Sequence, residues 1–251
     1  MKNQGILILS AGSPLVADLE ETCARARIPI AAIIRGDTGK EFALDPSLLL
    51  DAEELTDVQL RSPVITPMMT SGLRQRAYRR LAAVLGAERM PRFATVIDPT
   101  SIVARSASLG EGSYVNAGVV IGAASEFGAH CVLNRGCVLG HHLEVADYVT
   151  IAPGAVVQGD VVIERGATIC SNATINEYAR IGANSVVGMG SIVMKDVPPN
   201  TVVWGNPAKV MKTGVAGYKD IGVLPDAQLN LLSFGKPRGA SLPAAALAPR
   251  Q

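Results

Sequence analysis

The chain has 251 residues, of which 48% are hydrophobic, and this is enough apolar sequence to bury a sizeable core. Its 23 basic and 22 acidic side chains leave a formal net charge of +1, so the molecule as a whole has no field that would attract nucleic acid or an anionic membrane. No apolar run approaches the roughly 18 residues of a membrane span, no signal peptide is expected, and the 4 cysteines lack C-x-x-C spacing, so we predict a cytoplasmic protein with reduced thiols.

The first segment, residues 1–92, has the pattern of a small α/β domain. The apolar run Ile6–Leu9 is followed by the turn Ser10–Ser13 and a helical stretch, and a second apolar run follows at Ile30–Ile34. A further helix is predicted at about residues 70–86. The turn lacks the three spaced glycines of a dinucleotide-binding fingerprint, so we expect a Rossmann-like unit that does not bind NAD.

Residues 101–196 repeat every six residues without a slip. The third residue is apolar in all sixteen hexads, from Val103 to Val193, and Gly, Asn and Asp cluster at the fourth to sixth positions, where a chain that turns a corner needs them. Each hexad is therefore a short strand plus a corner, and three hexads make one triangular coil of 18 residues. Coils stacked at about 4.8 Å would bury the third-position side chains in one ladder. The sequence predicts an all-β parallel β-helix over residues 93–212. It does not match a β-sandwich, whose turn signals recur at roughly 8 to 12 residues.

The last segment, residues 213–251, carries Pro, Ala and Gly without clear periodicity. Such a composition is typical of a chain end that lacks a packed core of its own. We expect an extension that is extended or partly disordered, and we assign no chemistry to it.

Three motifs in and around the repeat carry a family resemblance. Val96-Ile-Asp-Pro99 leads into the repeat, Val132-Leu-Asn-Arg-Gly-Cys-Val-Leu-Gly-His-His142 lies within it, and the segment from Gly188 to Lys209, with Trp204-Gly-Asn-Pro207, closes it. Residues 5–212 resemble the hexapeptide-repeat sugar O- and N-acyltransferases of the sialic-acid O-acetyltransferase type, and are similar to bacterial acetyltransferases of UDP-linked 4-amino sugars.

The resemblance implies a left-handed β-helix, against the general right-handed rule for parallel crossovers. It also implies acetyl-CoA as acyl donor, direct attack by the acceptor, and a sugar or nucleotide-linked sugar as the small-molecule acceptor bound by the N-terminal domain. A single triangular prism has no deep cleft and three packed side by side make three, so we predict a homotrimer. Neither nucleic acid nor a membrane is expected as a partner.

The catalytic base of the family aligns with His141, one of three histidines in the chain with His130 and His142. The 18-residue step stacks Ala123 one coil before His141 and Gly159 one coil after it. Because both neighbours are tiny, the imidazole has open space around it, as a ligand site requires. The alternative is a structural or interface histidine.

His142 stands where close relatives carry a glutamate that raises the basicity of the catalytic histidine. The same step stacks Asp160 over His142, and Glu144 lies two residues beyond His142, so each is a candidate acidic partner. Both carboxylates equally fit a solvated surface. We take His141, His142 and Asp160 as the catalytic set.

The resemblance assigns the acyl-CoA contacts to Thr150, Ser171, Gly188 and Met189, where backbone groups do most of the binding. Thr150 replaces a histidine of the relatives and borders the thioester in this interpretation. An ordinary turn threonine is the alternative.

The acceptor contacts of the family fall on Gly12, Ser13, Arg35 and Asp37. Here the sequence departs from the pattern. The turn after the first strand is one residue shorter and has no histidine, and Arg35-Gly-Asp37 replaces an acidic pair.

The cysteines and the histidine spacings bear on two other kinds of chemistry. Cys131 and Cys137 occupy the small first position of consecutive hexads, which favours packing over an acyl-enzyme. The histidine spacings do not reproduce the zinc ligands of carbonic anhydrases built on this fold, so no metal is expected. The alternative function is a non-catalytic trimeric scaffold or sugar-binding protein.

Overall fold

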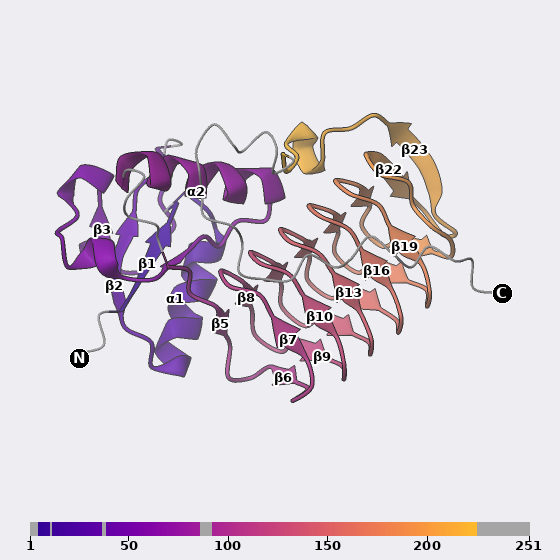
Figure 1. Cartoon of the computed structure of the whole chain (residues 1–251), viewed down its shortest axis with the longest axis horizontal. Helices are drawn as coiled ribbons and strands as arrows, with labels where there is room; N and C mark the ends of the chain where they lie inside the picture. The colour runs from indigo at the N-terminus through magenta and orange to yellow at the C-terminus, as the bar shows by residue number, and fades with distance from the viewer. Residues whose placement is uncertain (1–4, 11, 37–38, 86–91, 225–251) are drawn as a thin grey trace.

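A computed structural model describes residues 5–10, 12–36, 39–85 and 92–224 (Figure 1). An α/β domain occupies one end of the molecule, and the coils of a β-helix follow one another toward the other end (Figure 1). Asp37 and residues 225–251 of the predicted C-terminal extension lie outside the described residues. Neither described helix is long and apolar enough to cross a membrane.

The N-terminal domain is a parallel four-stranded sheet with strand order β3-β2-β1-β4. Its strands are β1 (Ile6–Leu9), β2 (Ile30–Ile34), β3 (Leu49–Leu50) and β4 (Val64–Ile65). Its helices are α1 (Leu15–Ala26) and α2 (Ser71–Leu85), and its 3₁₀ turns are η1 (Pro46–Leu48), η2 (Ala52–Glu54) and η3 (Gln59–Arg61). The predicted order of strand, turn, helix and strand is confirmed.

Successive side chains of β1 point to opposite faces of the sheet, and both faces are covered. Ile6 and Ile8 pack in one apolar cluster with α1, whereas Leu7 and Leu9 pack in another with Tyr78 of α2. Side chains on a strand point to opposite faces in turn, so a strand that is apolar at every position is buried between two layers. Each cluster also includes side chains of the β-helix, so the two domains share their cores.

The β-helix has three faces, which we call the covered, the aliphatic and the charged face. The covered face lies partly under the N-terminal domain, and the other two are named by their outward side chains. The strands of the covered face are β5 (Val96–Ile97), β8 (Tyr114–Val115), β11 (Val132–Leu133), β14 (Thr150–Ile151), β17 (Thr168–Ile169), β20 (Val186–Val187), β22 (Thr201–Trp204) and the antiparallel β23 (Lys209–Thr213).

The other two faces are open to solvent along most of their length. The aliphatic face has β6 (Ile102–Val103), β9 (Val120–Ile121), β12 (Val138–Leu139), β15 (Val156–Val157), β18 (Thr174–Ile175) and β21 (Ile192–Val193). The charged face has β7 (Ser108–Leu109), β10 (Glu126–Phe127), β13 (Glu144–Val145), β16 (Val162–Ile163) and β19 (Arg180–Ile181).

Stacked strands pair with residues 18 positions away, as the hexad phase predicts. Thr150, for example, pairs with Val132 on one side and Thr168 on the other. The third-position side chains form one buried ladder through the prism, in which Ile163 and Ile181 are fully buried. The predicted β-helix is therefore confirmed.

The sixth residue of each hexad turns the corner with a left-handed backbone. Every sixth residue from Gly112 to Gly190 has a positive φ, including His142 at 53° and Asp160 at 56°. Glycine, asparagine and aspartate tolerate this conformation best, which explains their abundance at these positions.

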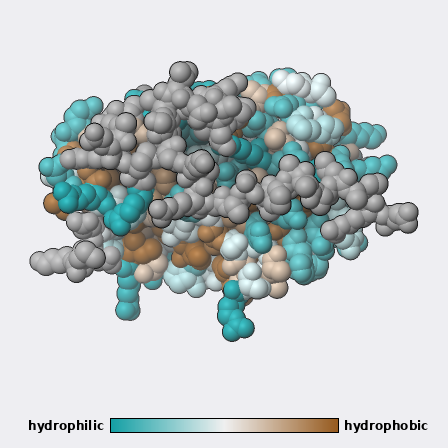
Figure 2. Space-filling model, viewed as in Figure 1, coloured by the Kyte–Doolittle hydropathy of each residue, from teal (hydrophilic) through white to brown (hydrophobic). Residues whose placement is uncertain are grey.

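One buried carboxylate joins α1 to the first coil. Asp98 is fully buried and accepts hydrogen bonds from Thr22 Oγ1 at 2.8 Å, Arg25 Nη2 at 2.6 Å and Thr100 Oγ1 at 2.7 Å. Burial alone would raise the pKa of Asp98, but these hydrogen bonds outweigh it and hold the pKa well below its usual range. In the view of Figure 2, apolar side chains gather below the centre, in the region where α1 meets the first coils.

Arg74 joins α2 to the β-helix. Its guanidinium is fully buried and donates hydrogen bonds to the carbonyl oxygens of His130, Tyr148 and Val149, to Thr150 Oγ1 and, at the start of α2, to the carbonyl of Met68. Burial lowers the pKa of Arg74 to about 10, which leaves it charged at neutral pH. Carbonyl groups from two domains therefore share one cation.

After β23 the chain returns to the domain interface and ends its described part there. Val223 exchanges hydrogen bonds with the side chain of Asn184, and Leu224 exchanges two with the side chain of Gln75 in α2, at 2.9 and 3.1 Å. The first part of the predicted C-terminal extension is thus packed against both domains.

Candidate functional site

His141 and His142 lie together at the corner that joins β12 of the aliphatic face to β13 of the charged face; we call it the histidine corner. Their Nδ1 atoms are 3.0 Å apart, and the two rings meet edge to face at 81°. Both residues are exposed. The hexad pattern has therefore placed two imidazoles in contact on a solvent-facing edge.

Asp160 occupies the same corner one coil later. Its Oδ2 is 3.7 Å from Nδ1 of His141, and its backbone N–H donates to the carbonyl oxygen of His141 at 2.9 Å. Asp160 lies one coil beyond His142, as the 18-residue step predicts, and its carboxylate also lies beside His141, the base for which it is a candidate acidic partner. Glu144, the other predicted candidate, is an exposed residue of β13.

Gly159 makes the space in which the imidazole of His141 lies. A Cβ atom built on Gly159 would be 2.5 Å from Cε1 and 2.8 Å from Nε2 of His141. Such distances are too short for any side chain, so the ring lies directly on the glycine. On the opposite side the N–H of His142 donates to the carbonyl of Ala123.

The contact between the two Nδ1 atoms constrains the protons on the rings. Two neutral imidazoles can share a hydrogen bond through Nδ1 only if one Nδ1 carries the proton and the other accepts it. When His141 is the donor, its Nε2 keeps a free lone pair and can act as a base. His142 then acts as the acceptor that fixes the orientation of His141.

Three of the four residues predicted to contact the acyl-CoA, Ser171, Gly188 and Met189, lie at a different corner, between the covered and the aliphatic face; we call it the cofactor corner. Ser171 is half-buried and Met189 is 62% exposed. Gly188 lies under the exposed indole of Trp204, because a Cβ there would be 2.9 Å from Trp204 Cγ. The Trp204-Gly-Asn-Pro207 motif alone assigns no role to Trp204, and its stacking on Gly188 makes it a further candidate contact.

Thr150 lies in the domain interface and not at a corner. It is fully buried, and its Oγ1 accepts a hydrogen bond from Arg74 at 2.8 Å and donates to the carbonyl of Met69 at 2.9 Å. The hydroxyl that was expected to border a thioester is thus engaged inside the chain.

The described acceptor residues lie at the carboxyl ends of β1 and β2. Gly12 is adjacent to Gly36, since a Cβ on Gly36 would be 3.9 Å from the Gly12 nitrogen. Ser13 is buried and donates through Oγ to the carbonyl of Pro67 at 2.5 Å, and Arg35 is exposed and pairs with Glu41 at 2.8 Å. Switch points at the carboxyl ends of parallel strands commonly bind ligands.

The N-terminal domain contacts the cofactor corner through the first turn of α1. Asp18 accepts from Arg135 Nη1 at 2.9 Å, and Asn116 and Asn134 of the same corner share a buried hydrogen bond of 2.9 Å. The contact joins α1 to the same corner that Ser171, Gly188 and Met189 occupy in later coils, whereas the histidine corner borders the opposite edge of the aliphatic face.

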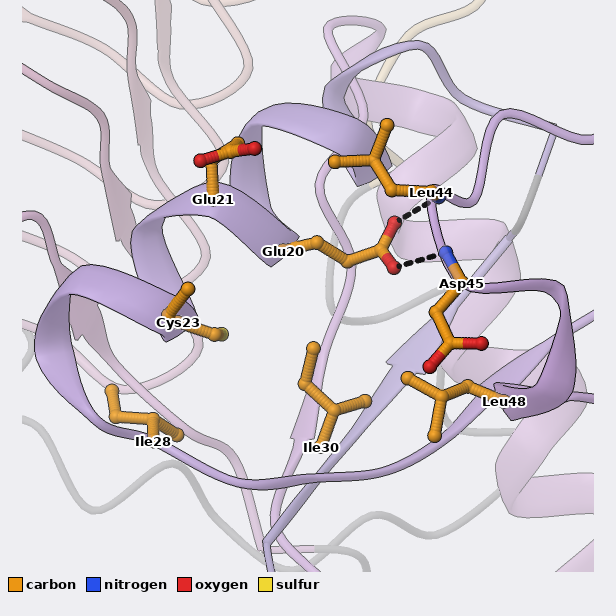
Figure 3. A pocket seen from close by; sticks show the side chains of 9 residues that line it. Glu20, Glu21, Cys23, Ile28, Ile30, Leu44, Asp45 and Leu48 are labelled. Atoms are coloured by element: carbon orange, nitrogen blue, oxygen red, sulfur yellow. Dashed lines mark hydrogen bonds between the residues drawn. The ribbon is translucent and has the colours of Figure 1, made fainter.

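A cavity of about 340 Å³ in the N-terminal domain contains none of the predicted site residues (Figure 3). Both carboxylate oxygens of Glu20 face the backbone there and accept hydrogen bonds from the N–H groups of Leu44 and Asp45, at 2.7 and 3.1 Å (Figure 3). Cys23, Ile28 and Leu48 supply apolar lining. Because the groups of Glu20 are already satisfied, this cavity offers little chemistry.

All 4 cysteines are buried and free. Burial raises the pKa of Cys131 and Cys137 to about 12, and that of Cys170 to about 11. Since a thiolate is the nucleophile, thiols held protonated in a core are inert. A packing role for them is favoured over an acyl-enzyme.

No protein-family model matches the chain, and no curated protein matches it. Solved structures do match. Perosamine N-acetyltransferase from Caulobacter crescentus, in complex with CoA and GDP-perosamine, is 26% identical over 83% of this chain and 97% of its own, with a TM-score of 0.72. A variant of that enzyme in which one histidine is replaced by asparagine matches at 25% identity with the same coverage and TM-score.

Two further structures extend the comparison. WeeI from Acinetobacter baumannii is 25% identical over 82% of this chain and 99% of its own, with a TM-score of 0.66. The acetyltransferase domain of PglB from Neisseria gonorrhoeae, in complex with acetyl coenzyme A, is 23% identical over 83% of this chain and 100% of its own, with a TM-score of 0.71, and is similar in fold. The predicted fold class, with its left-handed winding, and the resemblance to hexapeptide-repeat sugar acetyltransferases are confirmed.

Proposed function

We propose that this chain, which resembles the hexapeptide-repeat sugar acetyltransferases in fold and in motifs, transfers an acetyl group from acetyl-CoA to a nucleotide-linked sugar. The observation that carries the proposal is the histidine corner, where an exposed imidazole is oriented by a second one and lies on a glycine. The reduced, buried cysteines fit the cytoplasmic location that we propose for the enzyme.

The likeness to perosamine N-acetyltransferase supports the choice of both substrates. That enzyme was solved with CoA and GDP-perosamine, and the match covers both domains of the present chain. We therefore favour an amino group on a nucleotide-linked sugar as the acceptor, with a sugar hydroxyl as the second choice. The acetyl group is the acyl group of first choice.

In the proposed reaction His141 removes a proton from the attacking amine or hydroxyl through Nε2. The nitrogen or oxygen lone pair attacks the thioester carbonyl, a tetrahedral intermediate forms, and its collapse breaks the carbon–sulfur bond and releases CoA. Nδ1–H of His141 donates to His142, and the carboxylate of Asp160 at 3.7 Å compensates the positive charge that develops on His141. The reaction needs no covalent enzyme intermediate and no metal.

We propose that the active site is shared between chains of a homotrimer. The histidine corner and the cofactor corner border opposite edges of the aliphatic face, so one chain alone does not bring them together. That face exposes a ladder of branched side chains, with Ile102 at 67%, Val138 at 44% and Val156 at 37% exposure. An apolar stripe with a site residue on each edge is the surface expected to pack against a second copy.

The acceptor is proposed to bind at the carboxyl ends of β1 and β2, at Gly12, Ser13 and Arg35, with Asp37 as a further contact. The nucleotide lies there in this proposal, and the sugar extends past the ion pair of Asp18 and Arg135 toward the cofactor corner. Ser171, Gly188, Met189 and Trp204 border the pantetheine arm in this arrangement, and Thr150 supports them from the interior.

The test is a CoA-release assay with acetyl-CoA and a panel of GDP- and UDP-linked amino sugars. His141→Ala should lower kcat by roughly 10²- to 10⁴-fold and leave the affinity for acetyl-CoA nearly unchanged, because the ring acts on the proton of the acceptor. Turnover close to that of the wild type would refute His141 as the base. If acetyl-CoA gives no thermal stabilisation and no sugar is acylated, the chain is a scaffold or a sugar-binding protein.

A further inference from the structure

The side chains of the histidine corner also form a ligand set for a metal ion. One ligand atom from each of His141, His142 and Asp160 lies within 4.8 Å of the other two. A tetrahedral zinc ion with bonds of about 2.0 to 2.1 Å holds its ligand atoms about 3.3 Å apart. The separations of 3.0 Å between the two Nδ1 atoms and 3.7 Å between Nδ1 and the carboxylate lie on either side of this distance.

We propose that the histidine corner binds one Zn²⁺ per chain through Nδ1 of His141, Nδ1 of His142 and a carboxylate oxygen of Asp160. Imidazole nitrogen and carboxylate oxygen are ligands that zinc favours, and three protein ligands leave the fourth position open to water. Both histidines are exposed and Asp160 is partly exposed, so the ion reaches its ligands from solvent.

The backbone fixes the three ligands relative to one another. His141 and His142 are consecutive residues of one corner, and Asp160 is tied to them by the hydrogen bond from its N–H to the carbonyl of His141, at 2.9 Å. Little backbone freedom remains to be lost when the ion binds, and this favours affinity.

The bound ion inhibits the acetyl transfer proposed above. This consequence rests on the proposed function. Zinc takes the lone pair of Nδ1 of His141, so the ring proton must sit on Nε2. The ring stays neutral, because the proton passes from Nδ1 to Nε2 through solvent. The Nε2 atom that would accept the proton of the acceptor then has no free lone pair. The metal therefore holds His141 in the inactive tautomer.

The experiment titrates the full-length, metal-free chain with ZnCl₂ in a calorimeter and with CoCl₂ in a spectrophotometer. We expect one ion per chain and the visible absorption bands of tetrahedral Co²⁺. Asp160→Asn and His142→Asn should each weaken binding about tenfold or more. Asparagine is tolerated at both left-handed positions, so these variants keep the corner. Glu126→Gln, an exposed carboxylate of the charged face, is the matched control and should bind like the wild type.

Zn²⁺ should also abolish acetyl transfer by the wild type, and a chelator should restore it. A stoichiometry well below one ion per chain, or unchanged affinity in both His142→Asn and Asp160→Asn, would overturn the metal site. Zinc binding with the expected variant pattern in a chain that acylates no sugar would support the metal site and refute the proposed function instead.

Discussion

At Gly159 the absence of a side chain decides where a reactive group lies. The imidazole of His141 occupies the volume that a Cβ atom would fill. The backbone at Gly159 has no left-handed φ, so this glycine is required for space and not for its conformational freedom. A position one coil away from the base thus belongs to the geometry of the site.

Gly159→Ala should therefore displace the ring of His141 and leave the fold intact. The side chain of His141 is 60% exposed, so the ring can move away at little cost to stability. A misplacement of about 1 Å lowers kcat/KM by roughly 10²-fold. Steady-state kinetics and a thermal melt check both parts, with Gln158→Ala, an exposed neighbour, as control. Activity equal to the wild type would show that the position of the ring does not limit the reaction.

The direction of a corner side chain is also decided at the residue scale. Asp160 was predicted to stack over His142, and its carboxylate lies beside His141. The 18-residue step predicts which residues share a corner. It does not predict where each corner side chain points, because that also depends on the side-chain torsions.

At the scale of elements, α2 and the corner beneath it form a buried interface around His130. Its ring lies 4.4 to 4.8 Å, centre to centre, from those of Tyr78, Phe93 and Tyr148. Nδ1 of His130 has no hydrogen-bond partner and contacts the backbone at Gly112. Burial, with the nearby charge of Arg74, lowers the pKa of His130 to about 3.

This interface should lose stability in acid. The pKa of His130 is about 3 in the folded chain and 6.5 when unperturbed, so the unfolded chain binds the proton first. The contribution of neutral His130 to the free energy of unfolding is fully present above pH 6.5 and is lost progressively as the pH falls toward 3. At pH 4.5 the loss from this group is roughly 2 to 3 kcal/mol.

His130→Phe keeps an aromatic ring in the cluster and removes the titrating group. Between pH 8 and pH 4.5 its free energy of unfolding should fall less than that of the wild type, by the roughly 2 to 3 kcal/mol that the histidine contributes. Urea unfolding at one fixed protein concentration measures this difference, since assembly alters apparent stability. Parallel losses in the two proteins would mean that His130 is not the acid-sensitive group.

At the scale of the whole molecule, the described chain is a prism with its two candidate corners on opposite edges of one apolar face. The N-terminal domain covers part of another face and leaves this one open (Figure 1). The shared site that we propose therefore needs neighbouring copies, and each active site would take one corner from each of two chains.

Subunit complementation tests this arrangement. His141→Ala disables the histidine corner, and Ser171→Trp should block the cofactor corner with a bulky ring, so either variant alone should be inactive. Random co-assembly of equal amounts leaves about a quarter of the sites with two intact corners, and activity should recover to about that fraction. No recovery in proven mixed oligomers would place the whole site in one chain. Val138→Glu in both chains, which puts a charge on the aliphatic face, should separate the oligomer and abolish the recovery.

The sequence by itself determined the β-helix and the phase of its repeat. It also determined that His141, His142 and Asp160 share one corner, because in a strict six-residue repeat residues 18 positions apart stack on one another. It predicted β1, β2 and the two helices of the N-terminal domain from hydrophobic periodicity, but not the short strands β3 and β4. Only the tertiary structure decided that the hydroxyl of Thr150 belongs to the domain interface, that Arg74 gathers carbonyls from both domains, and that His130 is enclosed by aromatic rings. These contacts join residues far apart in sequence and depend on how one domain docks on the other, which no local pattern encodes.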